Sequence, residues 1–370
     1  MRQRKLVRPR LGWIGWLLLG VVGGAALIVA ATPMGRYLVR GAWEEARILS
    51  RRKSIAGLVA DSRTPPATRA KLELVLAARK FAVDSLGLPT KQVFTKFAQL
   101  DHDTLVLVLS GTRRDALVPA SWWFPVVGRV PYKGFFDFAA AARAERDLAA
   151  EGYDTYLRPA PAFSTLGWFN DPLLSTTLSD DPLFIVQTVI HELTHNRLYL
   201  PGEAVFNESF AEFVGNRGTV EFFLARGDAT NARTAEARWT DERLLGTVWE
   251  RAYREIDSVF KALPYAGAAR ANSGGDSVVR TSRLTGRDSV YARVRRLLVD
   301  TIAPQLATID KTYGARVRLD NAALLARRIY ATGLGDFERA WERDGRSVRR
   351  TVDRIAQAAA AGGDPYSVVR

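Results

Sequence analysis

Residues 181–215 read DPLFIVQTVIHELTHNRLYLPGEAVFNESFAEFVG and predict two helices joined by a tight turn. Asp181 is a suitable N-cap, and Pro182 suits the first helical position because its missing N–H has no intrahelical partner there. Apolar residues then recur at helical spacing until Pro201-Gly202, which stop the first helix near residue 200. The second helix is expected to return along the first.

The first helix carries His191-Glu192-Leu193-Thr194-His195, the H-E-x-x-H pattern. His191 and His195 are four residues apart, so both imidazoles project from the same face of the helix. Two neutral imidazoles on one face are suitable ligands for Zn²⁺. Glu192 is turned roughly 100° around the helix from His191, so it can stand beside the metal without binding it. A general base that deprotonates a metal-activated water molecule must stand there.

The second helix carries two carboxylates in residues 207–212, NESFAE. Catalytic zinc is usually held by three protein ligands, with a fourth position left for water. Glu208 is the predicted third ligand. Glu212 lies one turn further along, where its carboxylate can accept the second ring N–H of a ligating histidine and so fix the tautomer of that ligand. The predicted cofactor is therefore one Zn²⁺ ion.

Histidine is rare in this chain: there are only three, and two of them form the motif, so a chance match is a weak explanation. One alternative is a pair of surface or capping histidines without a metal. Another is a structural zinc, against which three ligands rather than four argue. The third histidine, His102, lies between two aspartates and is expected to be a loop residue.

The two helices resemble those of the gluzincin metallopeptidases, whose third ligand is a glutamate in an N-E-x-x-x-[DE] helix. From about residue 37 to the C-terminal helices, the chain resembles more closely the bacterial putative aminopeptidase family of membrane-associated zinc peptidases. Other segments that carry this resemblance are TPPATRAKLELVLAARKFAVDSLGLP, WFPVVGRVPYKGFFDF and STLGWFNDPLLST.

The resemblance implies that His191, His195 and Glu208 bind zinc, that Glu192 is catalytic and that the activity is amino-terminal cleavage of peptides. The gap from His195 to Glu208 is shorter than in the well-known gluzincins, so the second helix must return by a tight turn. This chain also lacks the cysteines that many members carry.

Composition limits the other possibilities. A chain of 370 residues, 47% apolar, is long enough for one large domain or two modest ones. The absence of cysteine excludes disulfides and thiolate ligands, so a metal site must use histidine and carboxylate. The net charge of +14 is spread along the chain without a recognised nucleic-acid motif, so no nucleic-acid partner is expected. Anionic lipid or an anionic envelope polymer is at least as good a partner for this charge.

The N-terminus predicts a membrane anchor. Residues 1–10 hold five basic side chains and are expected to stay in the cytoplasm, and residues 11–32 carry no charge and are long enough to span a bilayer. A cleaved signal peptide is the alternative reading of 11–32. The predicted location is the bacterial inner membrane, with a single span and the catalytic domain on the periplasmic or extracytoplasmic side.

The remaining chain predicts a helix-dominated α+β fold, zincin-like, over residues 36–362, with a loose tail at 363–370. Residues 36–60 form an amphipathic helix that either lies on lipid or faces the core. Strands are expected within residues 104–169, just before the zinc helix, and mainly helices follow residue 218. The sequence does not indicate the oligomeric state.

Substrate-binding residues are expected in the small sheet. An edge strand at residues 164–169 can hold an extended peptide, with Gly167 and Trp168 as contact residues, and a plain core strand is the alternative interpretation. Tyr132 is the candidate donor to the oxyanion, with Tyr199 and Tyr330 as rivals.

The predicted function is therefore hydrolysis of peptide bonds by an anchored zinc peptidase. Cleavage at the amino-terminal residue also needs a carboxylate that binds the free amine of the substrate, and Glu203 is one option. The alternatives are a non-catalytic envelope protein that keeps the zinc fold for binding, and a zinc amidase that acts on cell-wall peptides.

Overall fold

The computed structural model describes residues 12–13, 16–17, 20–21, 23–24, 31–101, 104–124, 128–160, 172–263, 274–362, 364 and 366–370. The chain divides into two compact units, Met1–Arg52 and Lys53–Arg370. Helices dominate and the sheets are small, as predicted.

The first unit contains the helix α2 (Pro33–Ser50). Thr32 caps it by accepting a hydrogen bond from the Gly35 N–H, and Pro33 occupies the first turn. Glu44 pairs with Arg40 at 3.1 Å and with Arg47 at 2.6 Å. These pairs at helical spacing stabilise α2 from within.

The transmembrane prediction is wrong. No helix in the described parts of the chain is long and apolar enough to cross a membrane, so the single-pass inner-membrane location predicted with it is not supported either. The prediction rested on the uncharged run 11–32, of which residues 11, 14–15, 18–19, 22 and 25–30 lie outside the described residues, as do residues 1–10. The long helix of this unit begins only at Pro33, and it carries charged side chains in each of its later turns.

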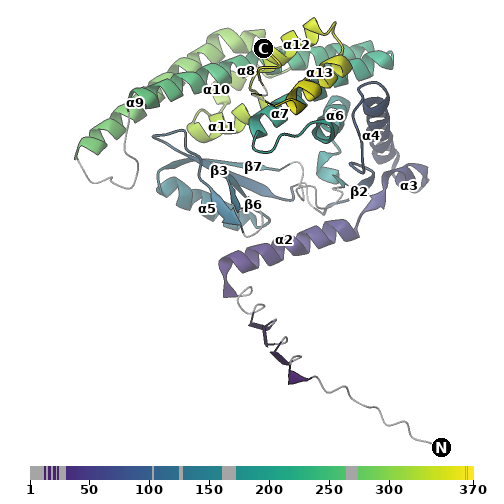
Figure 1. Cartoon of the computed structure of the whole chain (residues 1–370), viewed down its shortest axis with the longest axis horizontal. Helices are drawn as coiled ribbons and strands as arrows, with labels where there is room; N and C mark the ends of the chain where they lie inside the picture. The colour runs from purple at the N-terminus through teal and green to yellow at the C-terminus, as the bar shows by residue number, and fades with distance from the viewer. Residues whose placement is uncertain are drawn as a thin grey trace, which may run out of the picture. The chain divides into compact units, whose positions relative to one another are not determined.

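The second unit contains a three-stranded antiparallel sheet with the order β6-β3-β7 (Figure 1). Its strands are β3 (Leu107–Arg113), β6 (Tyr132–Phe135) and β7 (Tyr153–Pro159). Helix α5 (Phe138–Ala150) covers one face of this sheet and α11 (Asn321–Tyr330) the other (Figure 1). Alternate residues of each strand therefore face different helices.

Two smaller sheets complete the β structure. One has the order β1-β2-β8, from β1 (Lys53–Ser54), β2 (Lys96–Ala98) and β8 (Leu173–Leu174). The other is a hairpin of β4 (Trp122–Phe124) and β5 (Gly128–Val130). The strand predicted at residues 164–169 lies outside the described residues.

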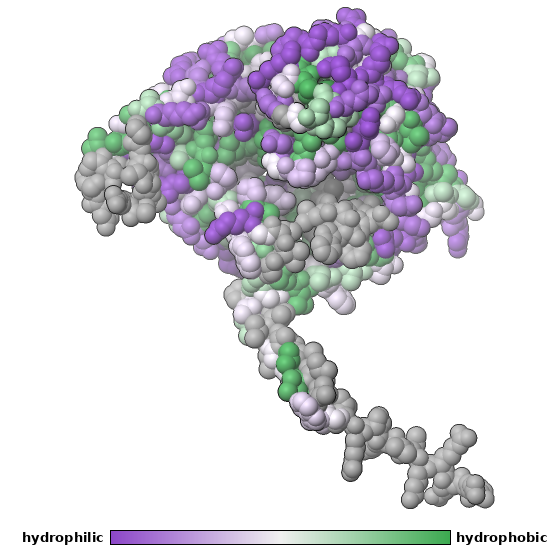
Figure 2. All heavy atoms as spheres, viewed as in Figure 1, coloured by the Kyte–Doolittle hydropathy of each residue, from purple (hydrophilic) through white to green (hydrophobic). Residues whose placement is uncertain are grey.

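The helical part is built around α7 (Ala204–Ala225), which is apolar on nearly all sides and is accordingly buried. Phe206, Phe210 and Phe213 are each fully buried and lie against the ring of Phe337 at centroid distances of 5.9, 5.7 and 5.5 Å. The helices that pack against α7 are α4 (Pro66–Asp84), α6 (Pro182–Arg197), α8 (Ala229–Ala262), α11, α12 (Leu334–Arg343) and α13 (Val348–Ala360). Helix α3 (Ile55–Ala60) packs against α4, and α9 (Gly274–Leu297) packs against α8; a short helix, α10 (Tyr313–Arg316), completes the helical part. Hydrophilic side chains gather over α12 and α13 at the top of Figure 2.

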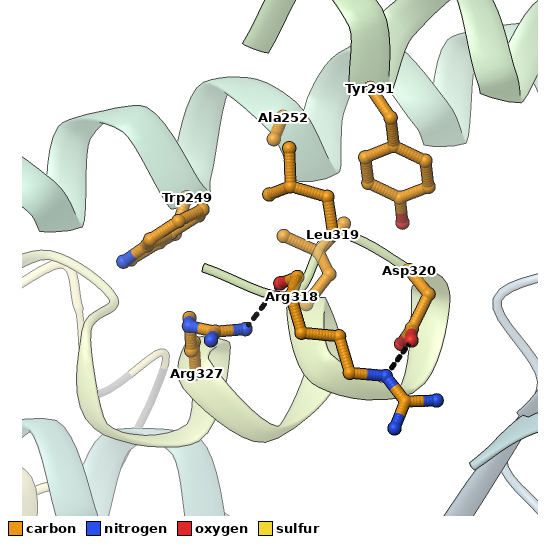
Figure 3. Close-up of a pocket in the computed structure, with 8 residues that line it drawn as sticks. Trp249, Ala252, Tyr291, Arg318, Leu319, Asp320 and Arg327 are labelled. Carbon is orange, nitrogen blue, oxygen red and sulfur yellow. Dashed lines mark hydrogen bonds and ion pairs between the residues drawn. The ribbon is translucent and has the colours of Figure 1, made fainter. Parts of the chain in front are cut away.

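Polar contacts fix the start of α11. Asp320 caps the helix by accepting from the Ala323 N–H at 2.8 Å, and the Tyr291 hydroxyl donates to the Asn321 side chain at 2.8 Å. Figure 3 shows the same junction, where Arg318 pairs with Asp320 and Arg327 donates to the Arg318 carbonyl at 3.2 Å. These contacts fix the position of the N-terminus of α11, and the length of the helix then determines where its last residue, Tyr330, lies.

Candidate metal centre

The site is formed where α6 and α7 pack against each other. The α6 helix begins as predicted, with Asp181 accepting from the Leu183 N–H at 2.9 Å and Pro182 in the first turn. It ends at Arg197, three residues before the predicted stop. Asn207 holds the turn that follows, because its side chain donates to the Leu200 carbonyl at 2.8 Å and accepts from the Leu200 N–H at 2.9 Å.

A glycine allows the two helices to approach closely at this point. A Cβ atom on Gly215 would lie 3.1 Å from the Gln187 carbonyl oxygen and 3.3 Å from the His191 Cβ, both tighter than ordinary contacts. Gly218, one turn further along, would meet Leu86 at 2.9 Å and Ile190 at 3.1 Å. Any larger side chain here would push α7 away from the face of α6 that carries the histidines.

His191, His195 and Glu208 come together in the interface. One nitrogen of each imidazole and one carboxylate oxygen all lie within 4.8 Å of one another. The Nε2 atom of His191 is 3.2 Å from Glu208 Oε2, and Nε2 of His195 is 3.7 Å from Glu208 Oε1. These separations lie on either side of the ~3.4 Å that two ligands of a tetrahedral zinc ion have between them.

Glu212 lies behind His191. Its Oε2 is 3.5 Å from His191 Nδ1, the ring nitrogen that does not face Glu208. Gln187 donates to the same carboxylate at 3.1 Å and Asn216 donates to its other oxygen at 2.7 Å. Glu212 is therefore held in place to fix the orientation of the His191 ring.

The electrostatics of the site favour a bound cation. Burial lowers the pKa of His191, but the hydrogen bonds with Glu208 and Glu212 outweigh it and raise that pKa to about 10. Burial also tends to raise the pKa of Glu208, and the hydrogen bond and charge of His191 reverse this, so the carboxylate stays ionised. The carboxylates on either side of this imidazole thus attract positive charge, which a metal ion can supply in place of a proton.

His195 has the properties of a neutral ligand. Burial, followed by the charge on His191, lowers its pKa to about 4, so its imidazole is uncharged at neutral pH. Its Nδ1 atom is buried and has no hydrogen-bond partner in the described part of the chain. The donor set of two imidazoles and one carboxylate, with a neutral histidine, therefore fits Zn²⁺.

The other predicted residues occupy different positions. Glu192 is half-buried beside this group, and its charge acts on His191 and on Tyr330. Tyr132 is on β6, which β3 separates from β7, and its side chain is 46% exposed. Glu203 is exposed at the start of α7. His102, Gly167 and Trp168 lie outside the described residues.

Of the two rival tyrosines, Tyr330 at the end of α11 has the closer relation to the site. Its ring centroid is 6.4 Å from that of His191, with the rings tilted by 35°. Ser209, which follows Glu208, donates to the carbonyl of Ile329 at 3.1 Å and so ties Tyr330 to the same helix as the ligand. Tyr199 contacts the edge of His195 at 6.4 Å but is 60% exposed.

Sequence reasoning missed Gln187, Asn216 and Arg158. Gln187 and Asn216 could have been found, because each lies four residues from a site residue on the same helix. Arg158 of β7 is distant in sequence, and its charge acts on both Glu208 and Tyr330.

These observations define a helix-dominated protein with a partly buried His₂Glu centre suited to a metal ion. Residues 36–364, which include every residue of this centre, match the model of the family described as "Putative aminopeptidase". Because this match spans most of the chain, the chain belongs to that family. No curated protein and no solved structure matches the chain. Membership supports a peptidase activity.

Proposed function

We propose that this protein is a zinc-dependent peptidase, with His191, His195 and Glu208 as the metal ligands. The observation that carries the proposal is the convergence of both Nε2 atoms on the Glu208 carboxylate, at 3.2 and 3.7 Å. The family description favours a peptide as the substrate and its amino-terminal bond as the site of cleavage.

Zinc bound here supplies Lewis acidity, which polarises a carbonyl and lowers the pKa of water. Glu212 holds the His191 ring through Nδ1, which leaves Nε2 free to bind. Glu192 follows His191 directly in the chain, so its carboxylate is close to the ligands without being one of them. It accepts the proton of the attacking water and passes it to the leaving amine.

Tyr330 is the donor that we assign to the oxyanion. Burial and the charge on Glu208 raise the pKa of its hydroxyl to about 12, so the phenol keeps its proton at neutral pH and can donate it in a hydrogen bond. The oxyanion role predicted for Tyr132 stays a prediction, since β6 is the far edge of the sheet from the strand that reaches the site.

Removing either of two ligands should remove the metal. We expect about one zinc ion per chain in the full-length wild type purified without chelator, and loss of most of it in His195→Ala and Glu208→Ala, because two remaining ligands hold zinc weakly. Metal analysis of the purified proteins measures this. Glu151→Ala, an exposed glutamate on the far side of the sheet, is the matched control and should keep its zinc.

A wild type that contains no zinc after zinc-replete expression would contradict the proposal. A protein that binds zinc at this site but cleaves no peptide would instead favour a binding role or hydrolysis of a cell-wall amide.

Tyr330→Phe should lower kcat about a hundredfold, because it removes one hydrogen bond to the developing oxyanion. The zinc content should not change, since the hydroxyl is not a ligand. Steady-state kinetics on a peptide library gives the first quantity and metal analysis the second. Tyr132→Phe and Tyr199→Phe are made in parallel, and the assignment fails if either of them has the larger effect on kcat.

A further inference from the structure

The geometry of β7 and α11 brings one cationic side chain to the metal centre. Thr155 of β7 contacts α5, since its hydroxyl donates to Glu145 at 3.1 Å. Asp154, on the opposite face, accepts from the Asn321 N–H at the start of α11 at 3.0 Å. Because strand side chains alternate, Arg158 faces α11 with Asp154.

The lengths of the two elements place Arg158 beside the last residue of α11. From Asp154 to Arg158 the strand advances about 13 Å, at roughly 3.3 Å per residue. From Asn321 to Tyr330 the helix advances about 13.5 Å, at 1.5 Å per residue. The two elements are joined at the first pair and pack along each other, so the second pair lies close together. The charge of Arg158 acts on the Tyr330 hydroxyl, in agreement with this placement.

Arg158 has capacity to bind a further group. Within the described part of the chain it forms no ion pair with a carboxylate, although Glu208 is close enough for the charge on Arg158 to lower its pKa. The side chain is only partly buried. A guanidinium has five N–H donors in a planar fork that matches a carboxylate, and the contact with Tyr330 uses few of them.

We propose that Arg158 binds a carboxylate of the substrate next to the scissile bond, and so selects acidic peptides. This proposal rests on the proposed peptidase function. The glutamates of the centre already contact the histidines, since Glu208 faces the ligand nitrogens and Glu212 holds His191. Arg158 therefore remains able to pair with a carboxylate of the substrate. The carboxylate can come from a free C-terminus one residue beyond the scissile bond, as in a dipeptide, or from an aspartate or glutamate side chain in a longer peptide.

Matched substrate pairs test the proposal and separate the two sources. The first pair is Ala-Ala and its C-terminal amide, and the second is Ala-Glu-Ala-amide and Ala-Gln-Ala-amide, all with the zinc-loaded full-length protein. We expect kcat/KM to favour the charged member of one pair by about tenfold or more, as for a charge-assisted hydrogen bond. The pair that shows the preference identifies the source.

Variants of Arg158 assign the preference to this residue. Arg158→Gln should remove the preference between the two members of the pair, mainly by raising KM for the charged member. Arg158→Lys should retain part of it, since the charge remains but the fork is lost. Arg146→Gln removes the same charge from the exposed face of α5, on the other side of the sheet, and should leave the preference intact.

A binding measurement separates failure of this proposal from failure of the peptidase function. Calorimetry on Glu192→Gln protein, with and without Arg158→Gln, compares the affinities for the acid and amide members without turnover. A tenfold preference for the acid that depends on Arg158 supports the proposal even if the wild type hydrolyses no peptide. Equal affinities for acid and amide would overturn it, and so would an Arg158→Gln effect of the same size on charged and uncharged substrates.

Discussion

Glu192→Gln should reduce kcat by about 10²–10⁴-fold and leave the zinc content unchanged. The amide keeps the size of the carboxylate but has no basic oxygen for the proton of water, and a general base contributes typically about 10²–10⁴-fold. Glu192 is near the ligands, since its charge helps to raise the pKa of His191 and that of Tyr330. Single-turnover kinetics on the best peptide substrate measures the chemical step directly.

The matched control is Glu151→Gln, the same change at the exposed C-cap of α5, which should leave kcat unchanged. Near-wild-type turnover in Glu192→Gln would refute the general-base role. If the variant instead loses its zinc together with its activity, Glu192 supports the metal site and is not the base.

The part of the site on α6 and α7 could be predicted because it depends on local geometry. Helical spacing alone puts His191 and His195 on one face, and the same spacing relates Glu208 to Glu212. The turn at Pro201-Gly202 then makes the two helices neighbours. Applying the same four-residue spacing once more on each helix would have predicted Gln187 and Asn216, the two residues that donate hydrogen bonds to Glu212.

The part contributed by the sheet and by α11 could not be predicted in the same way. Tyr330 is more than a hundred residues from His191 in the sequence, and its position depends on how α11 is anchored to β3 and β7. No local pattern distinguishes it from Tyr132 or Tyr199. The transmembrane prediction rested on the absence of charge in residues 11–32, whereas the described parts of the chain contain no helix long and apolar enough to cross a membrane.

Glu338→Gln should lower the free energy of unfolding by about 3 kcal/mol at neutral pH, since it removes one partner of a buried ion pair and leaves Arg217 with the more exposed Glu236 as its remaining carboxylate. Glu338 accepts from Arg217 Nε at 2.9 Å and from Trp239 Nε1 at 2.9 Å, and joins α12 to α7 and α8. The side chains of Arg217 and Glu338 are only 4% and 7% exposed. Urea unfolding of the full-length protein measures the difference.

The pH dependence of this difference separates the ion pair from simple packing. Burial tends to raise the pKa of Glu338, but the hydrogen bonds from Arg217 and Trp239 outweigh it and hold the pKa below its usual value. A carboxyl with a depressed folded-state pKa stabilises the protein above its unfolded pKa of about 4.3, and this contribution is lost as the pH falls through the folded value. The gap between wild type and Glu338→Gln should therefore be constant near neutral pH and shrink below about pH 4.

A surface ion pair provides the comparison. Glu255 pairs with Arg251 at 2.8 Å and with Arg293 at 2.9 Å, and these arginines are 62% and 52% exposed. Water and salt screen such pairs, so Glu255→Gln should cost less than about 1 kcal/mol. A cost for Glu338→Gln as small as this, or one that does not change with pH, would mean that the apolar packing of Phe337 and its neighbours holds α12 in place without help from the charge.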